Sequence, residues 1–213
     1  MKSVVLFMIL LTHGVYAQDL VFVFLHHRTD KVELPKDQLD KIMTGHMANI
    51  IRMAKEGKLL VAGPFEGGGG VFIFSSSSID TVSRWLSTDP GVQANRWNVE
   101  ILPYRWHIGQ PRLVNEPFEM LDYQLVRFVP YVAKFNINDV PELLKKHDDY
   151  LKEIQKTGQV VAEGTFGDVE GGILVTKGGL TQGIIESDPA VHGGLLEIEI
   201  KKWFVAKGAF GEK

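Results

Sequence analysis

Two histidine–aspartate pairs are the residues of this sequence whose types and spacing could move protons. His46 is followed by Asp89, and His147 is followed by Asp188. An aspartate bonded to one imidazole nitrogen fixes the tautomer and makes the other nitrogen a better general base. We therefore predict that all four are catalytic residues, with the first pair dominant. A structural explanation stays open, in which each histidine bonds a backbone carbonyl and each aspartate bonds nearby amides of an Asp-Pro turn.

The two pairs occupy matching places in an internal repeat. Four residues of the first half recur 101 residues later, and a four-residue Asp-Pro segment recurs 99 residues later. The shared residues are His46 and His147, Gly57 and Gly158, Gly63 and Gly164, Phe65 and Phe166, and the segments 89–92 and 188–191. This pattern predicts one domain at 18–108, a proline-containing linker at 109–118, and a diverged second domain at 119–213.

Hydrophobic periodicity predicts the same order of elements, β-α-β-β-α-β, in both copies. The first copy has expected strands at 20–26, 59–62, 71–74 and 97–102, with helices at 39–55 and 79–86. The second has expected strands at 123–129, 160–165, 172–176 and 195–204, with helices at 140–156 and 180–185. This is the ferredoxin-like arrangement, so the fold class is α+β. Because a domain of about 90 residues buries only a marginal core, we expect the two sheets to pack together as an intrachain pseudo-dimer. Trp97, Trp106 and Trp203 are expected to fill the core between the sheets.

The order of motifs resembles that of the YciI-like (YCII-related) family of the dimeric α+β barrel superfamily. A helix with a mid-face histidine precedes Gly-x-Leu-x-x-x-Gly-Pro-Phe, a glycine-rich turn, a short helix and Asp-Pro-Gly-Val. The first copy matches over 20–104. The second, over 123–203, is diverged, and its Gly-Pro-Phe has become Gly164-Thr165-Phe166. The resemblance implies two units that form an α+β barrel, here within one chain. It also implies a His/Asp site in a cleft of each unit, lined by the ligand-binding residues Gly63, Pro64, Phe65 and Phe166. The residues themselves favour a structural role for Gly63-Pro64-Phe65, as a rigid strand end with a core phenylalanine.

The resemblance gives the reaction less clearly than the fold. Most of the family has no assigned reaction, relatives include a dehydrochlorinase, and the wider superfamily holds lactone isomerases and monooxygenases that use neither metal nor flavin. We expect a small enzyme of lyase, isomerase or hydrolase type that acts on a small organic molecule. The alternatives are a non-catalytic ligand-binding module of the cell envelope, or a structural protein whose second copy completes the barrel.

No cofactor or metal is expected from the motifs. There is no dinucleotide fingerprint, and the glycine run at 67–70 lacks the Lys-Ser/Thr ending of a phosphate loop. A metal site needs three or more ligands, and only His26 or His27 could join His46.

The N-terminal residues predict export. Lys2, an apolar run at 4–11 and the small residue Ala17 form the pattern of a secretory signal peptide, cleaved after residue 17. The run is shorter than the roughly 20 residues that span a bilayer, so we expect no membrane span after cleavage and a periplasmic or extracellular protein. The chain has no cysteine, which excludes disulfides, and its net charge of −3 argues against a nucleic-acid surface. The expected partners are a small-molecule ligand and the internal pseudo-dimer; a further homodimer stays open.

Overall fold

The computed structural model describes residues 19–131, 137–167 and 171–212, so the expected signal peptide lies outside the described residues. The first half contains β1 (Leu20–His27), α1 (Lys36–Lys55), β2 (Leu59–Pro64), β3 (Gly70–Phe74), α2 (Ile79–Leu86), α3 (Pro90–Gln93) and β4 (Trp97–Ile108). The second contains β5 (Met120–Pro130), the 3-10 helix η1 (Ile137–Asp139), α4 (Val140–Gln155), β6 (Val160–Thr165), β7 (Gly172–Lys177), α5 (Gln182–Glu186), α6 (Pro189–His192) and β8 (Leu196–Ala206). No helix in these ranges is long and apolar enough to cross a membrane.

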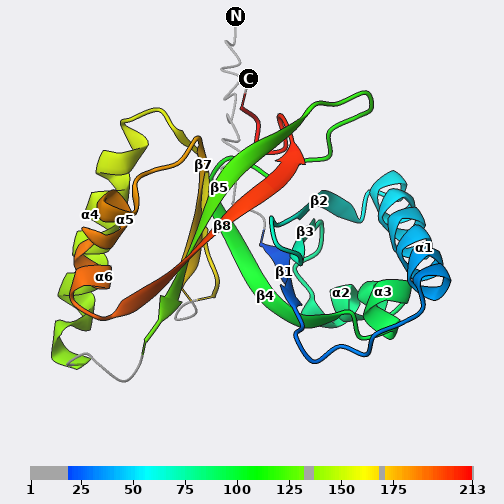
Figure 1. The fold of residues 1–213 in the computed structure, drawn as a ribbon. Helices are drawn as coiled ribbons and strands as arrows, with labels where there is room; N and C mark the ends of the chain where they lie inside the picture. Colours follow the sequence, from blue (N-terminus) through cyan, green and yellow to red (C-terminus); the bar gives the residue numbers. More distant parts are fainter. Residues whose placement is uncertain (1–18, 132–136, 168–170, 213) are drawn as a thin grey trace, which may run out of the picture.

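The two halves have the same strand order. The sheet runs β2-β3-β1-β4 through the first half and continues β6-β7-β5-β8 through the second. Every hydrogen-bonded neighbour is antiparallel, and the order within each half is that of a ferredoxin-like unit. The helices of the halves cover opposite outer sides of the sheet (Figure 1). The predicted α+β class is confirmed.

Two seams join the halves into a barrel. At the first seam β4 pairs with β6, where Arg105, Trp106 and Ile108 lie opposite residues 163–165. At the second seam the ends of the eight-stranded sheet meet: Phe65 bridges to Trp203, and the indole Nε1 of Trp203 donates to the carbonyl of Gly63 at 3.1 Å. The inner faces then enclose one apolar core of residues from both halves, among them Phe22, Tyr104, Leu125, Phe166 and Trp203.

The two repeated pairs of glycines have structural roles, one pair at the seams and the other at the ends of helices. A Cβ on Gly63 would lie 2.3 Å from the carbonyl oxygen of Phe204, and one on Gly164 would lie 2.5 Å from that of Arg105. Glycine in a strand is typical of such close backbone approach. Gly57 and Gly158 have φ values of 67° and 73° just after α1 and α4, where glycine ends a helix without steric cost.

Three expectations about the elements were wrong in extent or position. The short helices α3 and α6 are additional to the predicted order, because four-residue helices leave no periodic pattern. β4 continues to Ile108, six residues beyond the predicted end at residue 102, because its second half pairs with β6 of the other unit. Trp97 packs on the helical side of the first sheet, whereas Trp106 and Trp203 contact the barrel core as expected.

A charged cluster also connects the halves at one end of the barrel. Arg127 of β5 forms two parallel hydrogen bonds to Glu100 of β4, at 2.7 and 2.8 Å, and its guanidinium lies 4.4 Å from the ring centre of Phe24. His26 contacts the same carboxylate at 2.6 Å. The hydrogen bond of His26 lowers the pKa of Glu100 to about 2; burial opposes this shift and Arg127 adds to it. Glu100 is therefore ionised at neutral pH.

Glu100→Gln is expected to destabilise the protein at neutral pH. The pKa of Glu100 is lower in the folded protein than in the unfolded chain. The stabilisation by the ionised Glu100 is therefore full above about pH 4.5 and is lost as pH falls toward 2. The expected loss is about 1–2 kcal/mol, below the value for fully buried pairs because the Glu100 side chain is 33% exposed. Urea unfolding at pH 7 and pH 3 measures it. Glu119→Gln, which removes an exposed partner of Lys207, is the control and should change stability little. Equal losses at both pH values would contradict this assignment.

Candidate functional site

Asp89 begins α3, and its local sequence explains its position. Aspartate is favoured at the N-cap and proline at the first helical position, where its missing N–H has no partner to lose. The side chain is fully buried, and its Oδ1 accepts from the N–H groups of Gly91 at 2.9 Å and Val92 at 3.1 Å. The turn thereby fixes the carboxylate and leaves Oδ2 directed at α1.

His46 lies on the buried face of α1 and meets this carboxylate. Its Nδ1 is 2.9 Å from Oδ2 and 3.0 Å from Oδ1 of Asp89. Gly45 allows the contact, because a Cβ there would lie 2.9 Å from the ring of Pro90 and hold the two helices apart. The imidazole packs against Trp97 in a tilted arrangement, with ring centres 4.8 Å apart. His46 and Asp89, which are 43 residues apart in the sequence, are thus in direct contact in the fold.

Asn49 is a member of this site that the sequence analysis missed. Its Nδ2 donates to Oδ2 of Asp89 at 3.0 Å, and its own carbonyl accepts from Arg52 at 2.6 Å. It lies three residues after His46, which places both side chains on one face of α1. That spacing was the available signal, but an asparagine on an apolar face has no chemical signature by itself.

The protonation state of Asp89 follows from these contacts. Burial by itself raises the pKa of the carboxyl, but the hydrogen bonds from His46, Asn49 and the N–H of Val92 outweigh it and lower the pKa below the ordinary value. An ionised carboxylate only accepts hydrogen bonds, so the Nδ1 of His46 must carry the proton. A neutral His46 then presents the lone pair of Nε2.

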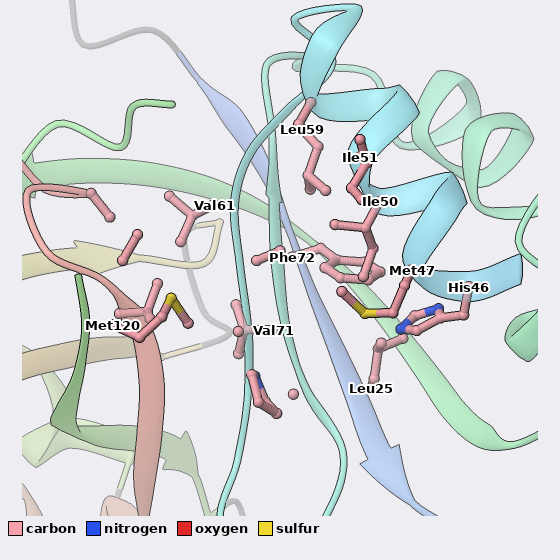
Figure 2. A pocket seen from close by; sticks show the side chains of 18 of the residues that line it. Leu25, His46, Met47, Ile50, Ile51, Leu59, Val61, Val71, Phe72 and Met120 are labelled. Carbon is pink, nitrogen blue, oxygen red and sulfur yellow. The ribbon is translucent and has the colours of Figure 1, made fainter. Parts of the chain in front are cut away.

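His46 lines a pocket of about 1200 Å³ between α1, the β2–β3 edge and the connection 112–118. Figure 2 shows His46 and part of the remaining lining. The side chain is 8% exposed, so only part of the ring reaches the space. Gly63 and Pro64, two of the predicted ligand-binding residues, line the same pocket. Phe65 and Phe166 lie in the barrel core instead and do not line it. Their predicted ligand contacts are therefore not with this space.

The second pair has the same core geometry with fewer donors. The Nδ1 of His147 lies 2.6 Å from Oδ2 of Asp188, and Asp188 accepts from the first N–H groups of α6. The position that matches Asn49 is Tyr150, whose hydroxyl donates to the carbonyl of Ile184. Asp188 therefore has no counterpart of the asparagine contact.

The remaining histidines have other surroundings. His26 faces Glu100 in the barrel, and His27 lies on the pocket side near Lys31. His107 contacts Glu163 across the first seam, and this hydrogen bond raises its pKa. Within the described ranges, no three histidine, aspartate or glutamate side chains form a group that could hold a metal ion.

The strand order and the paired His46–Asp89 site define an α+β barrel protein with a ferredoxin-like unit in each half. Residues 20–105 match the family model of the YCII-related domain, the family whose motifs the first copy resembles. The second half lies outside the matched residues. A comparison with curated proteins gives no match. A solved structure from Fusobacterium nucleatum subsp. nucleatum ATCC 25586, provisionally described as a monooxygenase, has 10% identity and a TM-score of 0.45, and the match covers 90% of this chain and 94% of that one.

Proposed function

We propose that this protein is an enzyme that moves a proton on a small organic substrate, with His46 as general base and Asp89 as its orienting partner. The observation that carries the proposal is the placement of His46, which bonds Asp89 through Nδ1 and lines the large pocket with the same ring. We further propose, from the expected signal peptide, that it acts after export.

The chemistry follows from the hydrogen bonds of the carboxylate. Asp89 fixes the imidazole orientation and stabilises the imidazolium that forms when Nε2 takes a proton from substrate. The same cation can return the proton to a leaving group or to a neighbouring atom, as elimination, isomerisation and hydrolysis each require. Asn49 and the α3 N–H groups keep the carboxylate in place during this transfer.

The proposal assigns the dominant role to the first unit. Asp89 accepts from four different groups, whereas Asp188 accepts from His147 and two backbone N–H groups. A carboxylate that is held less firmly orients its histidine less well. The second pair is therefore expected to contribute less to turnover.

Acylation by diethyl pyrocarbonate, whose carbonyl carbon is attacked by an unprotonated imidazole nitrogen, tests the proposal without a known substrate. His46 is expected to react through Nε2, and Asp89→Asn is expected to slow the reaction about tenfold or more because the tautomer is no longer fixed. Peptide mapping by mass spectrometry locates the modified histidines. Applied to protein from the native host, it also reports whether the mature chain begins at Gln18.

The exposed His27, which bonds no carboxylate, is the internal control and should react equally in both proteins. An unreactive His46 in the folded protein would show that its free nitrogen is sealed in the core, and the enzyme proposal would fall. A non-catalytic ligand-binding module would then be the better proposal, because the pocket exists whether or not His46 is basic.

A further inference from the structure

The pocket beside His46 exists because the two seams of the barrel differ. At the first seam, β4 continues to Ile108 and covers β6 as far as Glu163. At the second, backbone pairing is limited to residues 65–66 with 202–203, after which β8 ends at Ala206 and the chain turns away through Gly208. The edge of β2 at residues 59–62 is left beside an open space, which reaches from α1 to Val205 and the connection 112–118.

We call this elongated pocket the groove, and most of its wall is apolar. Figure 2 shows Met47, Ile50 and Ile51 of α1 on one side of the β2–β3 edge and Met120 on the other. Met47 is 52% exposed and Ile51 46%, which is unusual for large apolar side chains that line one continuous hollow. A volume of about 1200 Å³ exceeds that of most small-molecule sites, so the groove fits a long ligand better than a compact one.

Cations predominate among the charged side chains that line the groove. Its lining contains four permanent cations, Lys31, Lys55, Arg96 and Arg112, and one carboxylate, Glu116. Across the described ranges, none of the four cations forms an ion pair with a carboxylate. Arg96 is buried, donates to the carbonyl of Val32 at 2.8 Å, and directly precedes Trp97, which packs against His46. An uncompensated buried cation favours an anionic partner.

We infer that the groove binds a long-chain carboxylic acid, with its carboxylate toward Arg96 and Lys31 at the His46 end and its hydrocarbon chain along α1 and β2. The apolar walls remove the chain from water, and the cations distinguish the acid from a neutral chain of equal length. This names the substrate class of the proposed enzyme and rests on that proposal for the chemistry only. Binding itself requires no turnover.

Displacement of cis-parinaric acid, a fluorescent long-chain polyene acid, from the purified protein tests the inference. Dodecanoate is expected to displace it roughly tenfold more tightly than decanoate, since two methylenes are buried. 1-Dodecanol is expected to bind at least tenfold more weakly than dodecanoate. Arg96→Gln, which keeps donors for Val32, should remove most of this preference for the acid.

Met47→Glu combined with Ile51→Glu blocks the groove at two exposed positions, so the fold should persist. Dodecanoate affinity is expected to fall at least tenfold. Leu144→Glu, at a 41% exposed site on α4 that does not line the groove, is the control and should bind normally.

Three results would overturn the inference: no saturable binding, equal affinity for acid and alcohol, or binding that survives the double substitution. These outcomes are separate from the acylation of His46. A reactive His46 without acid binding would remove the inference and leave the enzyme proposal. Acid binding with an unreactive His46 would support the inference and remove the enzyme proposal.

Discussion

Trp203→Ala is expected to lower the free energy of unfolding by about 4 kcal/mol, the middle of the range for a large aromatic side chain removed from a core. Trp203 is fully buried, lies against Phe210 with ring centres 5.6 Å apart, and joins the second seam through its hydrogen bond to Gly63. Alanine leaves a cavity in the barrel and removes the hydrogen bond to the carbonyl of Gly63. Urea unfolding followed by circular dichroism measures the loss.

The neighbour Phe204 provides the control for this prediction. It is 41% exposed on the outer side of the same strand, so Phe204→Ala removes a similar ring without opening the barrel. Its cost is expected to stay below about 1.5 kcal/mol because a large part of the side chain is already in contact with water. Similar costs for both substitutions would mean that closure at the second seam contributes little to stability.

Asp89→Ala is expected to cost about 3–5 kcal/mol, as for removal of one member of a buried charged network. The substitution removes the N-cap of α3 and leaves His46 and Asn49 without their acceptor. Asp89→Asn keeps an acceptor for the N–H groups and should recover part of the loss. Because the pKa of Asp89 is lowered in the folded state, the contribution is present at neutral pH and is lost below the ordinary carboxyl range.

Asp188→Ala is the matched substitution in the second half. Asp188 caps α6 and bonds His147 in the same way, but it lacks the donor that Asn49 supplies to Asp89. Its removal is expected to cost about 1 kcal/mol less, the typical net value of one hydrogen bond. Thermal unfolding of both variants at pH 7 and pH 3 gives the comparison, and a larger loss for Asp188→Ala would contradict the assigned asymmetry.

The repeat in the sequence predicted both the fold and the neighbouring His46 and Asp89 of the first candidate site, because its shared residues have local structural roles. Gly57 and Gly158 end helices, Asp89 and Asp188 begin them, and these conformations depend on neighbours along the chain. Whether the four predicted catalytic residues act on a substrate, and whether Gly63, Pro64, Phe65 and Phe166 bind one, stays a prediction.

Asn49 and Trp97 show the limit of periodic patterns. Both were recognisable as members of a helix and a strand, yet neither pattern indicated that they would surround His46. The side of a sheet that a residue faces depends on the register of its strand with neighbours distant in sequence. For Trp97 the expected side was wrong for this reason.

The amino-acid sequence by itself determined the element types, their repeated order and the pairing of each histidine with an aspartate, because these depend on local periodicity and on the repeat. Tertiary structure decided the contacts between the halves: the extension of β4 onto β6, the Arg127–Glu100 pair, and the short second seam that leaves the groove open beside His46. Each of these contacts depends on how two strands that are distant in the sequence lie relative to one another. The local residue pattern of either strand does not predict that arrangement.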